Sequence, residues 1–160
     1  MKKLNRITGD VLLGVGSMVA VGMLAGASVQ AHHAFSAEFD ANRPVRVTGT
    51  IARIDWINPH AWIHLDVKNK DGRVERWMFE LGGPGPLARR GIKRGSPELA
   101  PGTEVTAEGF LSKGQPLRAN GRVLQYSSSG KTLFVGSSGT GAPQSESEIK
   151  SGVDIEKAPN

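Results

Sequence analysis

The residues best suited to bind a metal ion are the four histidines, His32, His33, His60 and His64. Cleavage of the chain after Ala31 would make His32 the first residue, which then offers two nitrogens, its α-amine and its imidazole Nδ1. One further imidazole would complete a three-nitrogen site, a donor set that suits Cu(II) in tetragonal geometry. We therefore expect a copper site formed by His32 and His60 and assisted by His33.

The spacing of His60 and His64 limits how many imidazoles can join His32. On one extended strand, their Cα atoms would lie about 13 Å apart, too far for easy chelation of one metal ion. Pro59 and the alternation of apolar residues argue against a helix that would bring them together. At most one of the two is expected to join His32, and His60, at the corner of a hairpin, is the more exposed. The alternative is that these histidines are solvated and bind no metal.

A second candidate site is a ligand surface on the strand that follows Pro59. Trp62 and His64 alternate with the apolar residues of this strand, so they share the face opposite to the core. With Arg53 and the loop residues Arg89 and Arg90, they are expected to bind an envelope component or a partner protein. The competing interpretation is that the tryptophan belongs to the core and that the arginines form an ordinary solvated loop.

Several classes of function find no support in the sequence. Cysteine is absent, so thiolate metal centres and disulfides are excluded. The carboxylates are isolated along the chain, the serines show no nucleophile-elbow pattern, and the glycine-rich segment 82–85 is not followed by a phosphate-loop Lys-Ser or Lys-Thr. The sequence therefore predicts a non-enzymatic binding module.

The N-terminus has the pattern of a secretory signal peptide. A short basic segment precedes an apolar run from Val11 to about Val29, and small or branched residues lead to Ala31. The alternative is a membrane anchor, since the run is nearly long enough to span a bilayer. Cleavage would remove three basic residues and one acidic residue and lower the formal net charge from +5 to +3. We expect a periplasmic or secreted protein with no stable membrane anchor after cleavage and no nucleic-acid partner.

Strand and turn signals predict one small all-β domain over residues 32–136. Strands are expected at 44–57, 61–67, 74–81 and 103–111, followed by a last hairpin over 121–126 and 132–135, with a bulge near Ala52-Arg53. Pro86 and Gly91 bound a short helix between the third and fourth strands. This order predicts a five-stranded OB-like barrel, with a small open sandwich as the alternative. Residues 137–160 are rich in Gly, Ser and charge, a composition typical of a disordered tail.

Several motifs together resemble one family. They are His32-His33-Ala34-Phe35, Thr48-Gly49-Thr50-Ile51, the Trp-x-Asn-Pro-His element at 56–60 with the Ala-Trp-Ile that follows, Trp77-Met78-Phe79-Glu80 and Arg89-Arg90-Gly91. This set is similar to that of a family of small exported bacterial proteins classified as a domain of unknown function. The resemblance extends from His32 to about Gly136. It implies an exported small β-barrel and supplies no activity and no catalytic residues.

Overall fold

The computed structural model describes residues 31–137 and 141–151, with side chains from residue 35 onward. The predicted signal peptide lies outside these residues except for Ala31. The described elements, in chain order, are α2 (Ala31–Glu38), β1 (Phe39–Asp55), β2 (Trp62–Lys68), β3 (Val74–Glu80), α3 (Pro84–Arg89), the 3-10 turn η1 (Pro97–Leu99), β4 (Glu104–Ser112), β5 (Arg118–Tyr126), β6 (Thr132–Phe134) and α4 (Glu146–Ser151).

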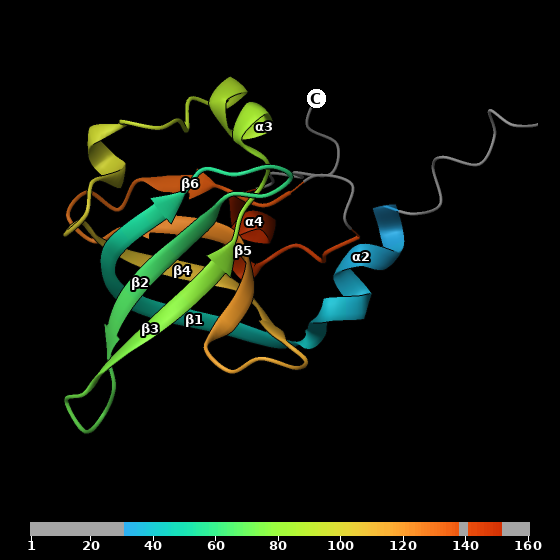
Figure 1. Cartoon of the computed structure of the whole chain (residues 1–160), viewed down its shortest axis with the longest axis horizontal. Helices are drawn as coiled ribbons and strands as arrows, with labels where there is room; N and C mark the ends of the chain where they lie inside the picture. The colour runs from blue at the N-terminus through green and yellow to red at the C-terminus, as the bar shows by residue number, and fades with distance from the viewer. Residues whose placement is uncertain (1–30, 138–140, 152–160) are drawn as a thin grey trace, which may run out of the picture. The chain divides into compact units, whose positions relative to one another are not determined.

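The strands form one sheet whose hydrogen bonds close into a ring (Figure 1). Within the described residues, the sheet has six strands in the order β3-β2-β1-β4-β5-β6, and β3 also pairs with β5. That closing pair is parallel, whereas the other neighbours are antiparallel. The expectation of a mainly β fold is confirmed. The predicted count of five strands is not, because both segments of the last predicted hairpin, β5 and β6, are strands of the sheet.

Strand β1 joins the two sides of the ring because it bends. Its first part pairs with β4 up to Thr50, and its last part pairs with β2 as far as Asp55. The register shifts between Ile51 and Arg53, as predicted from the change of phase in the sequence. An extra residue there bends the strand and increases its twist. Figure 1 shows β1 curving round from β4 to β2.

The core lies inside this ring. Ile63 and Leu65 of β2, Phe79 of β3 and Val105 of β4 are fully buried there. The helix α3 closes one side of the core with Leu87, which is also fully buried. Pro84 begins this helix, two residues earlier than predicted, because its missing N–H costs nothing in a first helical turn.

A second apolar cluster holds α2 against the sheet. Phe35 of α2, Phe39 of β1, Phe110 of β4 and Ala142 of the tail pack together and are buried. The ring of Phe35 stacks on Phe39 and meets Phe110 edge-on, each with centroids 5.8 Å apart. These contacts anchor the helix α2 to the sheet.

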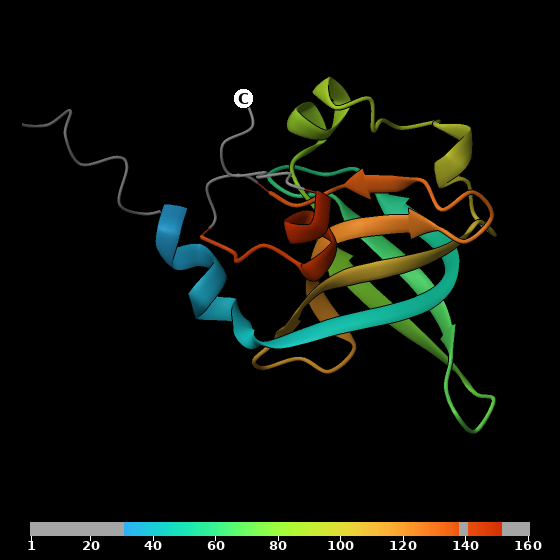
Figure 2. The same cartoon turned by 180° about the vertical axis from the view of Figure 1, so that it is seen from behind.

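The tail also contains structure that its composition does not predict. Residues 146–151 form the helix α4, which lies against β4 and β5 (Figure 2). Glu148 is fully buried and forms two hydrogen bonds with the guanidinium of Arg122 in β5, at 3.0 and 2.9 Å. A charge pair at long sequence separation orders this segment, so local composition gave no sign of it. Residues 138–140 and 152–160 of the predicted disordered tail lie outside the described residues.

Candidate functional site on the β2 and β3 strands

Polar side chains gather on the face of β2 and β3 that points away from the core. In the register of the sheet, Asp55 lies opposite Trp62, and Trp62 lies opposite Glu80. Next along the strands, Arg53 lies opposite His64. Residues directly opposite one another in neighbouring strands project to the same face. The sheet thus brings an arginine, a histidine, a tryptophan and two carboxylates to one surface.

His60 and Glu80 form a close polar contact at the edge of this face. His60 follows Pro59 in the β1–β2 loop, and its Nδ1 donates to Oε1 of Glu80 at 2.6 Å. The carboxylate of Glu80 is buried, with 7% of its side chain exposed, whereas His60 keeps 28%. The hydrogen bond to Glu80, and then the negative charges of Glu80 and Glu38, raise the pKa of His60 against the opposing effect of its burial.

Arg118, the first residue of β5, links Glu80 to the helix α2. It forms an ion pair with Glu38, the last residue of α2, and its Nη2 lies 3.9 Å from Oε2 of Glu80. Its guanidinium also stacks over the ring of Trp62, 4.7 Å from the centroid. A cation over an indole face is an attractive arrangement, and its contribution grows as the pair is desolvated. Arg118 therefore fixes α2 and Trp62 together beside the His60–Glu80 pair.

The second histidine of the face, His64, is buried. Its Nε2 lies 2.8 Å from Oδ2 of Asp55, and only 5% of its side chain is exposed. Asp55 is also held by Arg53, whose Nε donates to Oδ1 at 3.1 Å. The hydrogen bonds from Arg53 and then His64 lower the pKa of Asp55, although desolvation acts in the opposite direction. The expected exposure of His64 is therefore wrong, because its imidazole is covered and forms a hydrogen bond with Asp55.

Two of the predicted ligand-binding residues, Arg89 and Arg90, do not join this face. Arg90 turns toward the tail and donates from Nη1 to the carbonyl of Gly136 at 2.9 Å, and its burial lowers its pKa. Arg89 is exposed on α3. Arg53 does lie beside His64, as described above. The five proposed ligand-binding residues are thus divided between the β2–β3 face and the segment near α3.

The predicted metal ligands are placed only in part. His32 and His33 lie in the first turn of α2, and their side chains are outside the described set. Among the described side chains, no group of three or more His, Asp or Glu residues is arranged to hold a metal ion. Of the proposed donors, the structure positions the imidazole of His60 alone, with Nδ1 occupied by Glu80. Its Nε2 is the atom that this contact leaves for a ligand.

Three residues of this site were missed in the sequence. Glu38 and Glu80 were read there as isolated carboxylates, and Arg118 was not singled out at all. Each belongs to a different element, and the parallel pairing of β3 with β5 brings Arg118 to Glu80. No local spacing records that pairing.

The chain belongs to a family of unknown function. A family model described as "Family of unknown function (DUF6152)" matches residues 20–120. This match contains α2, β1, β2 and β3 and the residues of the His60, Glu80 and Arg118 cluster. No curated protein and no solved structure matches the chain. In residues 31–137 and 141–151, no helix is long and apolar enough to cross a membrane.

Proposed function

We propose that the protein is an exported, non-enzymatic binding module that holds Cu(II) between His60 and the N-terminal histidine of its mature chain. In this proposal the signal peptide is removed after Ala31, so that the α-amine and Nδ1 of His32 chelate the ion. His60 supplies the third nitrogen through Nε2, and His33 assists. The module acts in the periplasm or outside the cell.

The observation that carries the proposal is the contact between Nδ1 of His60 and Glu80. A histidine that ligates a metal through one ring nitrogen commonly donates its other N–H to a carboxylate, which fixes the tautomer and the ring orientation. Glu80 is in turn buried and lies near Arg118, so the carboxylate is itself held in place. His60 thus has the supporting contact that a ligand through Nε2 requires.

The position of α2 is consistent with a donor from His32. Glu38 ends this helix at Arg118, close enough to His60 for its charge to raise the pKa of the imidazole. Glu38 lies six positions after His32 in this helix, a rise of about 9 Å along the axis. The helix therefore begins within reach of the β1–β2 loop if its first turn rearranges to bring the free amine to the ion.

The same proposal includes an OB-type barrel for the scaffold. The ring β1-β2-β3-β5-β4, the parallel β3–β5 pair and a helix between β3 and β4 all support this assignment. OB-type barrels bind their ligands on strands two and three and the adjoining loops. His60, Trp62 and Glu80 lie on those elements.

A Cu(II) titration tests the metal site directly. The protein beginning at His32 is compared with a version carrying one extra N-terminal glycine, which blocks the chelate and leaves every side chain in place. Electron paramagnetic resonance counts the nitrogens bound to the copper. We expect stoichiometric binding with at least three nitrogens, loss of the tight site in the extended version, and about a tenfold or greater loss of affinity for Glu80→Gln. Unchanged affinity in His32→Ala would rule the proposal out.

A second candidate function is favoured by Arg118. Its Nε is buried and has no hydrogen-bond partner among the described residues. Arg118 also lines a pocket of about 450 Å³ with Glu38 and Lys113. A cationic surface beside Trp62 suits an acidic envelope component, such as an anionic polysaccharide, with no metal involved. Co-sedimentation with purified anionic polysaccharide, for the natural protein and for Trp62→Ala, tests this function. Equal recovery of the two proteins would count against it.

A further inference from the structure

A pocket of about 480 Å³ lies away from the β2–β3 face, between β1, β4 and the tail. Pro44 and Val45 of β1, Phe110 of β4 and Ile149 of α4 supply its apolar walls. Ile149 leaves 65% of its surface exposed, which is unusual for a large apolar side chain of the described part of the protein. A concave site with apolar walls and a few polar groups is the common form of a small-molecule site.

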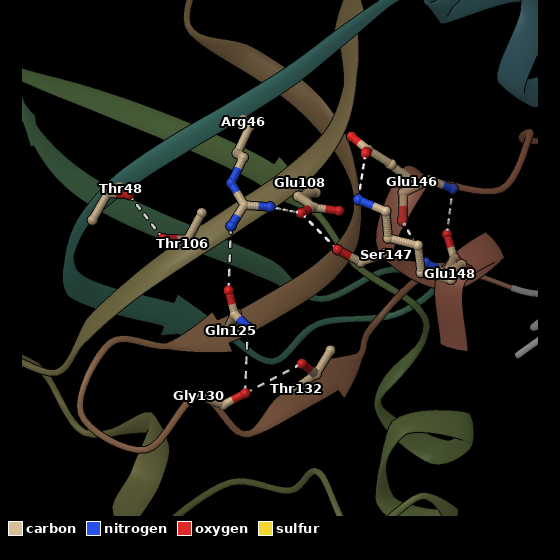
Figure 3. A network of polar contacts seen from close by, with 12 residues as sticks. Arg46, Thr48, Thr106, Glu108, Gln125, Gly130, Thr132, Glu146, Ser147 and Glu148 are labelled. Carbon is tan, nitrogen blue, oxygen red and sulfur yellow. Dashed lines mark hydrogen bonds and ion pairs between the residues drawn. The ribbon is translucent and has the colours of Figure 1, made fainter. Parts of the chain in front are cut away.

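The most buried charged group of this pocket is the carboxylate of Glu108. Its side chain is 9% exposed, and Oε1 accepts hydrogen bonds from Arg46 and from the hydroxyl of Ser147, the latter at 2.7 Å. Figure 3 shows the second oxygen on the side away from Arg46, toward α4. This oxygen, Oε2, is shielded from solvent and has no partner among the described residues. A buried acceptor without a donor is unfavourable, and a ligand N–H would relieve that cost.

The charges around the pocket favour a cationic ligand. Arg46, Glu108 and Glu146 are the charged residues that line it, so its formal charge is negative. The guanidinium of Arg46 is already engaged by Glu108 and by the side-chain oxygen of Gln125, at 3.2 Å for the latter (Figure 3). Glu146 is likewise paired, with Lys150 at 2.6 Å, so the oxygen of Glu108 that has no partner is the acceptor left for a ligand. An anionic ligand would be repelled by this carboxylate, whereas an ammonium group would complement it.

The tail completes this pocket because a buried ion pair holds it in place. Arg122 of β5 and Glu148 of α4 are 2% and 0% exposed, and Glu148 also accepts from the backbone N–H of Ser145 at 2.8 Å. Ser145 and Ile149 are themselves part of the pocket wall. The docking of α4 therefore has a consequence besides stability, which is to close one side of the pocket.

We infer that the pocket between β1, β4 and α4 is a binding site for a small amphipathic amine, whose ammonium group donates to Oε2 of Glu108 while its apolar body packs on Phe110 and Ile149. The site is separate from the His60 cluster and independent of the proposed copper site. No described metal donor set or predicted ligand residue lies in it.

Three probes of the same shape test the charge preference. 2-Phenylethylamine is a cation at neutral pH, 2-phenylethanol is uncharged and phenylacetate is an anion. Binding is followed by NMR chemical-shift changes in the protein with its full tail. We expect the amine to bind at least ten times more tightly than phenylacetate, with the largest shifts at Gly109, Phe110 and Ser145. Equal affinities, no saturable shifts with the amine, or shifts centred elsewhere would overturn the inference.

Two variants separate the carboxylate from the apolar wall. Glu108→Gln should weaken amine binding at least tenfold and remove its advantage over the alcohol, while Glu104→Gln, an exposed residue of the same strand, should leave it unchanged. Ile149→Ser should weaken binding of the amine and of the alcohol alike, because both ligands would pack on this apolar wall. Ile149 is exposed, so its loss should leave the core intact. Amine binding that survives both Glu108→Gln and Ile149→Ser would place the ligand outside this pocket.

Discussion

Nδ1 of His60 lies 2.6 Å from Oε1 of Glu80, so a loop histidine and a buried strand carboxylate form one charged pair. The hydrogen bond and the charge of Glu80 raise the pKa of His60 above its ordinary value of 6.5. A raised pKa in the folded protein means that His60 binds its proton more tightly there than in the unfolded chain. This stabilisation is complete below pH 6.5 and is lost as the pH rises through the folded pKa.

Replacement of Glu80 by Gln should therefore destabilise the protein more at pH 5.5 than at pH 8.5. Loss of a hydrogen bond to a charged group costs about 1.5 kcal/mol at the lower pH, and this part should fade at the higher one. A smaller cost from the neighbouring Arg118 should persist at both. Urea unfolding at the two pH values measures the difference, and NMR should show a lower pKa for His60. Glu104→Gln is the control, and an equal loss at both pH values would contradict the assignment.

The Cu(II) affinity of the proposed site should depend on pH in the same range. A metal binds the neutral imidazole, so protons compete with it, and a raised pKa of His60 extends that competition to higher pH. Below the folded pKa of His60, the affinity should fall tenfold for each unit by which the pH is lowered. Protonation of the α-amine should add a further loss. In Glu80→Gln the fall due to His60 should begin at a lower pH. Titrations between pH 5 and 8 in both proteins would show this shift, and superimposable profiles would contradict it.

Tyr126 allows a clean spectroscopic prediction because it is the sole tyrosine of the sequence. Burial, with a smaller effect from the charge of Glu98, raises the pKa of Tyr126 to about 12. Absorbance of the phenolate should therefore appear about two pH units later in the folded protein than in urea. Since the folded pKa is the higher one, the stability from this group is complete below pH 10 and declines between pH 10 and 12. Ionisation near pH 10 in the folded protein would show that the hydroxyl is solvated.

The sequence predicted the strands and the bulge of β1 well because these features leave local signals. The phase change near Arg53 located the shift in β1. The burial of Ile63 and Leu65 followed from alternation alone. Such features depend on neighbours in the chain, so a single sequence records them.

The site was less predictable because its contacts join distant segments. Trp62 was placed on the correct face, but its partner Arg118 is 56 positions away, and the link runs through the β3–β5 pairing. His64 alternates like an exposed residue, yet Asp55 and the surrounding side chains cover it. Alternation shows which face a residue occupies. It does not show whether polar neighbours bury that face.

Gly109 is predicted to tolerate no side chain. A Cβ at this position would lie 2.0 Å from the carbonyl oxygen of Asn120 and 2.9 Å from its carbon, and both are backbone atoms of the paired strand β5. Neither can move without opening the sheet, so Gly109→Ala should cost about 3 kcal/mol or more of the free energy of unfolding. Gly114→Ala, which meets nothing within 4 Å, is the matched control and should change stability by less than about 0.5 kcal/mol. Equal unfolding curves for the two variants would show that β4 and β5 do not approach this closely.

The Arg122–Glu148 pair predicts that a single carboxylate controls the docking of the tail. Glu148→Gln leaves the guanidinium of Arg122 buried without its countercharge, a change that typically costs about 3 to 5 kcal/mol. Undocking of α4 would solvate Arg122 and limit that cost, so the main effect should be faster amide exchange at Ile149 and its neighbours, with little change in β1 or β2.

The neighbouring residue Glu146 provides the control for this experiment. It lies on the same helix but is exposed, and its partner Lys150 is exposed as well. Glu146→Gln should therefore change stability by less than about 0.5 kcal/mol. Gly136→Ala should reproduce the Glu148→Gln effect by another route, because its Cβ would lie 3.0 Å from Nη1 of Arg122 and would push the guanidinium away from Glu148. If amide exchange in α4 is the same in all three variants, then the tail does not depend on this ion pair.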